Sequence, residues 1–256
     1  MNVRLFDTHC HLHDSEFYLE GREEAYDDSI KAGVAMICVG TTVQSSREAI
    51  DFCASHEFCY PAVGIHPHEA NVEDVEQIRQ LVEENRDNIV AIGEIGLDYF
   101  YEHSPRDVQQ AVLRAQLQVA SDYDLPVSFH VRGAFDDFWP IFDEISGIRG
   151  VLHSFTDNSV NLEQALARRL KIGINGISTF TKDAAQQRLF RELSLEYILL
   201  ETDAPFLTPT PLRGKVNIPA NVELVAQHQA GLKRQSLDEV VRATTTNALE
   251  LFRIKL

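Results

Sequence analysis

The chain has 256 residues, of which 44% are hydrophobic and 24% are charged, and its formal net charge is -16. These fractions are typical of an ordinary soluble protein. No apolar run approaches the roughly 18 residues that a membrane-spanning helix needs. The acidic excess opposes long-range attraction to a polyanion, and this disfavours a protein that binds DNA through a basic groove.

The N-terminal segment, residues 1–7, has no apolar core and no small-residue cleavage site. It therefore lacks the pattern of a secretory signal, and a cytoplasmic protein is expected.

Short apolar or β-branched runs alternate with longer amphipathic stretches up to residue 209. Such alternation is typical of repeated strand and helix units around a parallel sheet. Strands are predicted at residues 3–6, 34–41, 60–65, 89–93, 126–130, 150–153, 171–177 and 197–203. The pattern predicts one domain, residues 1–256, of the α/β class, folded as a (β/α)8 TIM barrel.

Helices are predicted at residues 23–32, 44–56, 72–86, 105–123, 134–145, 159–170, 182–193, 220–231 and 236–252. In the fourth of these helices, the spacing of Val108, Ala111, Val112, Ala115 and Val119 predicts the face that packs on the sheet. The proline-rich segment 205–219 follows the last strand and is expected to be an ordered functional loop.

Side chains that can bind metal recur where the predicted strands end, and the carboxyl ends of barrel strands converge on one face. His9 and His11 are two residues apart on an extended segment, so both side chains point the same way. The candidate ligands are His9, His11, Glu94, His130, His153 and Asp203. Four imidazoles and two carboxylates exceed what one tetrahedral zinc requires, and the set predicts a site for two divalent cations.

A single histidine or acid at the end of a strand is more often a solvated or capped loop residue. Individually, His13, His68 and Asp98 are interpreted in this way, as loop or supporting residues. The distribution of histidines argues against this reading for the whole set, because seven of the ten lie at or just after predicted strand ends.

At these positions the sequence resembles the TatD family of metal-dependent deoxyribonucleases, within the wider class of amidohydrolase-like barrels. The resemblance rests on the segments 7–12 (DTHCHL), 64–67 (GIHP), 93–99 (GEIGLDY), 130–132 (HVR), 153–155 (HSF), 200–205 (LETDAP), 213–215 (RGK) and 245–252 (TTNALELF). Two positions depart from the usual family pattern: His13 replaces an aspartate, and Ile218 replaces the glutamate of an Asn-Glu-Pro segment.

The resemblance implies that His9, His11, Glu94 and Asp203 hold one cation and that Glu94, His130 and His153 hold the other, with Glu94 as the bridge. It also implies that four further side chains face the phosphates of the substrate, namely His66, Arg132, Arg213 and Lys215. The family and the ligand types together allow zinc, manganese or magnesium.

The expected reaction is hydrolysis of nucleic-acid phosphodiesters, with DNA favoured over RNA and single-stranded or frayed ends favoured over duplex. A water that bridges the cations would lose a proton and attack phosphorus, with Asp203 as the first candidate base and Glu201 as the second or as an orienting group. No membrane and no stable protein partner are expected.

Two alternatives remain open at this stage. A Glu-bridged centre of the same class could hydrolyse carboxyl esters, lactones or aminoacyl esters. The barrel could also be a metal-binding scaffold without turnover. A centre bridged by a carbamylated lysine is disfavoured, because no lysine lies between Lys31 and Lys171 and Glu94 stands in the bridging place.

Overall fold

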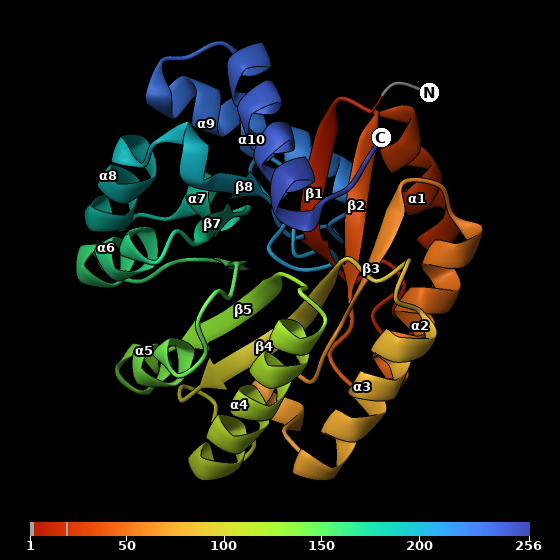
Figure 1. The fold of residues 1–256 in the computed structure, drawn as a ribbon. Coiled ribbons are helices and arrows are strands. Elements are labelled where there is room, and N and C mark those ends of the chain that lie inside the picture. The colour runs from red at the N-terminus through yellow and green to blue at the C-terminus, as the bar shows by residue number, and fades with distance from the viewer. Residues whose placement is uncertain (1–2, 19) are drawn as a thin grey trace. The chain divides into compact units, whose positions relative to one another are not determined.

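The strands of the computed structural model follow the predicted order along the chain (Figure 1). The structure describes residues 3–18 and 20–256, so Met1 and Asn2, the start of the segment in which no signal was predicted, lie outside the described residues. The strands are β1 (Leu5–Cys10), β2 (Val34–Val39), β3 (Cys59–Val63), β4 (Ala91–Asp98), β5 (Val127–Arg132), β6 (Gly150–Leu152), β7 (Lys171–Ile174) and β8 (Ile198–Leu200).

A helix follows each strand, and the helical bounds lie within a few residues of the predicted ones. The α-helices are α1 (Arg22–Lys31), α2 (Val43–Ser55), α3 (Val75–Glu84), α4 (Arg106–Asp122), α5 (Phe135–Asp143), α6 (Ser159–Ala167), α7 (Ile177–Phe180), α8 (Ala184–Glu192), α9 (Val222–Lys233) and α10 (Leu237–Phe252). Short 3-10 turns are η1 (Pro67–Glu69), η2 (Val72–Asp74), η3 (Leu195–Tyr197) and η4 (Pro219–Asn221).

Strand order in the sheet is the chain order, from β1 to β8. The register is parallel for β3 with β4, for β4 with β5, for β5 with β6 and for β7 with β8. Strands that alternate with helices and pair in chain order define the (β/α)8 TIM barrel, so the predicted fold class is confirmed.

The chain divides into two compact units, and the sites below are described unit by unit. Unit 1 comprises Met1–Ile37 and Ser154–Leu256, and unit 2 comprises Cys38–His153. The core of unit 2 includes Phe129, which packs against Phe138 with ring centroids 5.2 Å apart. Among the residues that the structure describes, none of the helices has the length and apolar character to cross a bilayer.

Four sequence-based details are wrong, and one of them is the end of the eighth strand, which was predicted at Asp203 but lies at Leu200. The fourth strand was predicted to end at Gly93, but β4 continues to Asp98 and pairs with β5 as far as Asp98 opposite Arg132. The register shifts between Ile92 and Ile95, so Glu94 lies in an irregular part of the strand. Such a bulge redirects a side chain without leaving a signal in the apolar pattern.

The seventh strand ends at Ile174 instead of Ile177, because the Asn175 side chain accepts a hydrogen bond from the Ile177 amide (3.0 Å) and starts the short helix α7. On α4, the predicted face is partly wrong, although Val112 and Val119 are buried as predicted. Val108 and Ala115 are half-buried and Ala111 is exposed. The buried face carries Gln109, Val112, Leu113, Gln116, Leu117, Val119 and Ala120.

Candidate metal centre

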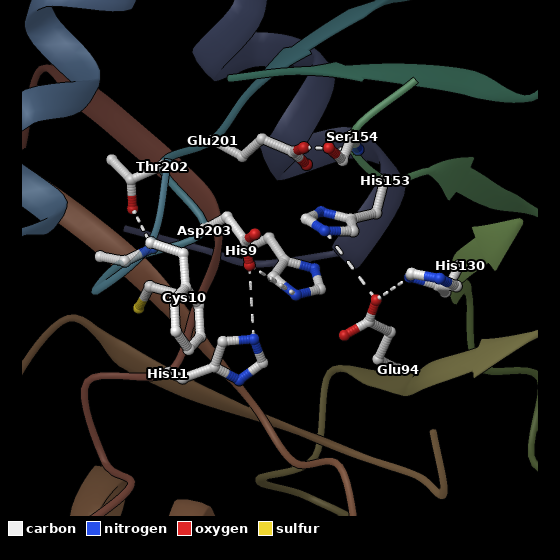
Figure 2. Close-up of polar contacts among 12 residues, drawn as sticks. His9, Cys10, His11, Glu94, His130, His153, Ser154, Glu201, Thr202 and Asp203 are labelled. Atoms are coloured by element: carbon white, nitrogen blue, oxygen red, sulfur yellow. Dashed lines mark hydrogen bonds and ion pairs between the residues drawn. The ribbon is translucent and has the colours of Figure 1, made fainter. Parts of the chain in front are cut away.

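Unit 1 brings together the two histidines at the end of β1 and the aspartate that follows β8. We call His9, His11 and Asp203 the β1 cluster. The Nε2 atoms of His9 and His11 lie 3.9 and 3.5 Å from Oδ1 of Asp203 (Figure 2). One ligand atom from each of the three residues lies within 4.8 Å of the other two.

Main-chain hydrogen bonds set the positions of the β1 cluster. The His11 amide donates to the Ala204 carbonyl (2.8 Å), and the Asp203 amide donates to the His9 carbonyl (2.9 Å). Asp203 has a φ of 57°, in the left-handed region that aspartate tolerates better than most residues. His9 lies in β1 and His11 directly follows its last residue, and both side chains approach Oδ1 of Asp203, in agreement with the shared face that strand parity predicted.

Asp7, a buried acid, lies two residues before His9 on β1. Oδ1 of Asp7 accepts from the Thr202 amide (2.8 Å) and the His9 amide (3.3 Å), and Oδ2 accepts from the Thr202 hydroxyl (2.5 Å). Burial raises the pKa of Asp7 to about 8, against the opposing effect of these hydrogen bonds. Asp7 therefore links β1 to Thr202, which follows β8.

Glu201, predicted as the second-choice base, is buried in unit 1. Its Oε1 accepts from the Ser154 amide (2.7 Å, Figure 2) and lies 3.5 Å from Nδ2 of Asn175. A Cβ at Gly173 would come within 2.3 Å of the Glu201 carboxylate, so glycine at this position makes room for the acid. These contacts connect Glu201 to Ser154, at the start of the segment that follows His153, and to Asn175.

Unit 2 gathers three histidines around Glu94. We call Glu94, His66, His130 and His153 the β4 cluster. Oε1 of Glu94 lies 2.9 Å from Nδ1 of His130, 3.8 Å from Nε2 of His66 and 3.9 Å from Nε2 of His153. Figure 2 shows the contacts of Glu94 with His130 and His153. The three histidines come from β5, from the residues after β3 and from the residue after β6, so the barrel order brings them together.

Asp98, which the sequence suggested as a loop or supporting residue, is fully buried at the end of β4 and supports His130. Its Oδ2 lies 3.0 Å from Nε2 of His130 and 3.0 Å from Nε2 of His68, and its Oδ1 accepts from the Phe100 amide (2.9 Å) and the Tyr101 amide (3.1 Å). A carboxylate on the far nitrogen of a histidine is the usual partner of a metal-binding imidazole, because it fixes the tautomer and the ring orientation.

The buried titratable side chains of unit 2 shift the pKa values of one another. Burial opposes the cationic form of His130, but its hydrogen bonds to Asp98 and Glu94 outweigh burial and raise its pKa to about 9. Burial alone would raise the pKa of Asp98, yet the contact with His130 and the two backbone amides hold that pKa well below its usual range. For His66, burial is the dominant effect and lowers the pKa to about 3, so this imidazole is neutral and can donate a lone pair.

The four residues expected to face phosphates have different surroundings. His66 belongs to the β4 cluster, with its ring centroid 4.5 Å from that of His130. The Arg132 guanidinium lies over the rings of Phe100 (4.2 Å) and Tyr101 (4.8 Å). In unit 1, the Arg213 guanidinium lies 3.8 Å from the Phe180 ring centroid and donates to the Thr208 carbonyl (2.8 Å), and Lys215 is exposed on the same loop.

The donor sets fit divalent cations. In each unit, at least two imidazoles and one carboxylate place one ligand atom each within 4.8 Å of one another, in the groups His9–His11–Asp203 and His66–Glu94–His130. Imidazole with carboxylate is a ligand type that zinc and manganese accept in proteins. The residues present therefore fit zinc and manganese, two of the three metals that the sequence allowed, and the fit extends to His66, which was expected to contact substrate.

Sequence reasoning missed two buried glutamines on α4, the helix that lies along β4 in Figure 1. The Gln116 side chain accepts from the Ile65 amide (2.8 Å) and donates to the Ile65 carbonyl (3.1 Å), next to His66. The Gln109 side chain accepts from the Asp98 amide (2.8 Å) and donates to the Asp98 carbonyl (3.1 Å). Their seven-residue spacing, which also separates Val112 from Val119 and Leu113 from Ala120, is the signal that would have found them.

A TIM barrel that carries buried imidazole and carboxylate clusters at the carboxyl ends of its strands defines a metal-dependent hydrolase of the amidohydrolase-like class. The family model described as "TatD related DNase" matches residues 6–253. The chain therefore belongs to the TatD family of metal-dependent hydrolases.

Relatives of known sequence or structure agree with this assignment. The chain is 33% identical to the Bacillus subtilis protein YabD, an uncharacterized metal-dependent hydrolase, over 98% of this chain and 99% of that protein. It is 32% identical to a 3'-5' ssDNA/RNA exonuclease TatD from Erwinia amylovora, over 97% and 99% of the two chains. The crystal structure of the TatD homologue YjjV from Escherichia coli superposes on this chain with a TM-score of 0.91 at 29% identity. The superposition covers 100% of both chains.

Proposed function

We propose that this protein is a phosphodiesterase that degrades single-stranded nucleic acid, with DNA as the preferred substrate and frayed ends as the site of attack. The observation that carries the proposal is the pair of clusters, each rich in imidazole and carboxylate, on a TatD-type barrel. The name of the Erwinia relative, a 3'-5' ssDNA/RNA exonuclease, supports the choice of substrate.

In this proposal, His9, His11, Asp203 and Glu94 hold one divalent cation, and Glu94, His130 and His153 hold a second. The support is the convergence of strand carboxyl ends in this fold and the position of Glu94 among three imidazoles. Bound cations would neutralise charge on the phosphate and lower the pKa of a water molecule. Zinc, manganese and magnesium are the candidates to test.

The protein's own side chains would accept a proton, orient a neighbouring segment and contact the substrate phosphates. Asp203 is the proposed proton acceptor, because its carboxylate is the part of the β1 cluster that reaches solvent. Glu201 orients the segment after His153 through the Ser154 amide, and this is the role that its contacts support. His66, Arg132, Arg213 and Lys215 are the proposed phosphate contacts, and they would attract the substrate locally although the whole chain carries a net charge of -16.

The test replaces the residue at the centre of the β4 cluster. Glu94→Ala is expected to abolish turnover of labelled single-stranded DNA and to lower the metal content from about two ions per chain, because one side chain serves both ions. Glu76→Ala, which removes an exposed acid from α3 in the same unit, is the matched control and is expected to keep both. Full activity of Glu94→Ala would overturn the bridging role.

A substrate panel separates the proposal from its rivals. The panel holds single-stranded DNA, single-stranded RNA, a p-nitrophenyl phosphodiester and lactones, each assayed with zinc, manganese and magnesium. Turnover of lactones alone would make the protein an ester hydrolase of the same class. Bound metal without turnover of any member would make it a scaffold. Labels at the 5' and 3' ends of the DNA give the direction of degradation.

A further inference from the structure

Exposed aromatic rings occur in three of the segments that follow strands carrying or preceding residues of the clusters. Among the residues that the structure describes, the aromatic side chains left exposed are Phe17 (41%), Phe100 (64%), Tyr101 (52%) and Phe206 (45%). Phe17 and Phe206 lie in unit 1, after β1 and after β8, while Phe100 and Tyr101 follow β4 in unit 2. Scattered exposed apolar residues are ordinary, but aromatic rings grouped beside a site indicate a binding surface.

In unit 1, Phe17 and Phe206 form a pair beside the β1 cluster. Their ring centroids lie 5.1 Å apart in an edge-to-face arrangement. The His11 ring lies 5.7 Å from Phe17 and 6.4 Å from Phe206. The two phenylalanines are 189 positions apart in the sequence (206 minus 17), so the fold and not a local motif creates the pair.

Buried polar side chains hold both rings in place. The Phe206 carbonyl accepts from Nδ2 of Asn217 (2.7 Å), and the Asn217 carbonyl accepts from the hydroxyl of Tyr18, the neighbour of Phe17 (2.5 Å). The Phe17 amide donates to the carboxylate of Asp14 (3.2 Å). Asn217 and Asp14 are themselves buried. The pair is therefore a built feature of unit 1, anchored through Asn217 on both sides.

The aromatic pair of unit 2 differs in one respect that matters for binding. The guanidinium of Arg132 already covers the rings of Phe100 (4.2 Å) and Tyr101 (4.8 Å). For Phe17 and Phe206, no cation lies over the rings among the described interactions, and each residue keeps more than a third of its surface exposed. The unit 1 pair is the better stacking surface for a planar ligand.

We infer that Phe17 and Phe206 form a stacking platform for a nucleobase of the single-stranded substrate, at the nucleotide next to the phosphate that the β1 cluster receives. This inference rests on the proposed function. Stacking on aromatic rings tolerates any base, because every base has a π-face. It also suits an acidic protein, since it supplies affinity that a basic groove would otherwise provide. Paired and stacked bases of a duplex cannot use it, and this favours single-stranded ends.

The experiment combines a change in the protein with a change in the substrate. Phe17→Leu, Phe206→Leu and the double variant are assayed on a single-stranded DNA and on the same strand with an abasic residue at the position under test. The wild type is expected to prefer the strand with the base by about tenfold in kcat/KM, with most of the difference in KM. The double variant is expected to lose that preference and to cleave the abasic strand like the wild type.

Control variants exclude a merely structural effect. Tyr197→Leu removes a half-buried aromatic ring at the opposite end of β8 in the same unit and is expected to keep the tenfold preference. Phe206→Trp keeps an aromatic face at this position and is expected to keep the tenfold preference for the strand with the base. A double variant that loses activity equally on both strands, or a wild type that does not distinguish them, would overturn the platform.

A binding measurement separates this inference from the proposed function. Fluorescence anisotropy of a methylphosphonate strand, which the enzyme cannot hydrolyse by the same route, reports base stacking without turnover. One outcome is that the wild type binds methylphosphonate strands with bases about tenfold better than abasic ones and yet hydrolyses no unmodified single strand. In that case the proposed function fails and the platform stands. If the pair instead joins two copies of the chain, the double variant will change the sedimentation coefficient and not the base preference, and the inference fails.

Discussion

The β1 cluster and the β4 cluster contain the same kinds of side chain but are held in different ways. In unit 1, main-chain bonds between His9 and Asp203 and between His11 and Ala204 fix the ligand spacing, and the side-chain atoms of the cluster stay 3.5 to 3.9 Å apart. In unit 2, side chains hold one another directly, with His130 between Glu94 at 2.9 Å and Asp98 at 3.0 Å.

This difference predicts where the protein is sensitive to substitution. Main-chain bonds survive most side-chain changes, so the geometry of the β1 cluster depends mainly on strand pairing. Buried charged groups that hold one another lose their partners when one is removed, and an unpaired buried charge is costly. Unit 2 should therefore respond more strongly than unit 1 to single substitutions around its ligands.

Among substitutions of supporting residues, the largest expected effect on activity is that of Asp98→Asn. The amide keeps an oxygen for the amides of Phe100 and Tyr101 but loses the carboxylate that faces His130 and His68. Loss of a carboxylate behind a metal-binding histidine typically costs about 10- to 100-fold in metal affinity or activity. We expect kcat/KM on single-stranded DNA and the affinity for zinc to fall within that range, with little change in the circular dichroism spectrum.

Asp136→Asn is the matched control, because Asp136 is exposed in the first turn of α5 in the same unit. It should leave both measurements unchanged. If Asp98→Asn and Asp136→Asn behave alike, the β4 cluster does not depend on its supporting acid and the contrast between the two units is lost.

A smaller effect on activity is expected from Gln116→Met, which keeps the side-chain volume but removes both hydrogen bonds to Ile65. Each buried main-chain group left without a partner costs about 1–3 kcal/mol. We expect the free energy of unfolding in urea to fall by about 2–4 kcal/mol, with a raised KM if His66 moves with the backbone of Ile65.

Gln118→Met on the same helix provides the comparison, because Gln118 is exposed and bonds only to Asp122 (2.7 Å) among the interactions described. Its effect on unfolding should stay within about 0.5 kcal/mol. Equal effects of the two glutamine variants would show that α4 does not position the end of β3 through Gln116.

Residue pattern alone predicted much of the fold and part of the site. All eight strands were found because buried parallel strands are apolar along their whole length, as in β2 and β8. His9 and His11 were predicted to share a face because strand parity is a local property. The end of β4 was misplaced because a bulge leaves no periodic signal, and the register shift at Glu94 appears only when β4 pairs with β5.

The supporting residues of unit 2 depend on contacts between distant segments. Asp98 could be listed as a candidate from its motif, but its hold on His130 requires β4 and β5 side by side. Gln109 and Gln116 were left out of the predicted buried face of α4, because an apolar pattern of alanine and valine was chosen over one that contains polar residues. A buried glutamine is predictable only when its main-chain partners are known.

The smallest effect concerns unit 1 and tests its reliance on main-chain groups. Lys233, at the end of α9, donates from Nζ to the carbonyls of Phe190 (2.8 Å), Arg191 (3.3 Å) and Leu193, where α8 ends. The carbonyls of Phe190 and Arg191 belong to the last four of α8, which an α-helix leaves without partners of its own. Lys233→Met should lower the free energy of unfolding by about 1–2 kcal/mol at pH 7.

The pH dependence of that loss has a defined sign. Burial lowers the pKa of Lys233 from 10.5 to about 8, so between these values the unfolded chain binds more protons at this residue than the folded chain does. The stability of the wild type therefore gains from this residue as the pH rises from about 8 to about 10.5, and the methionine variant lacks the gain. Urea unfolding across this range should show the difference between the two proteins widening, while Lys255→Met, at an exposed position, should follow the wild type. A difference that narrows with pH would mean that the three carbonyls favour the charged amine more than burial opposes it, and that main-chain groups stabilise unit 1 through charge as well as through hydrogen bonding.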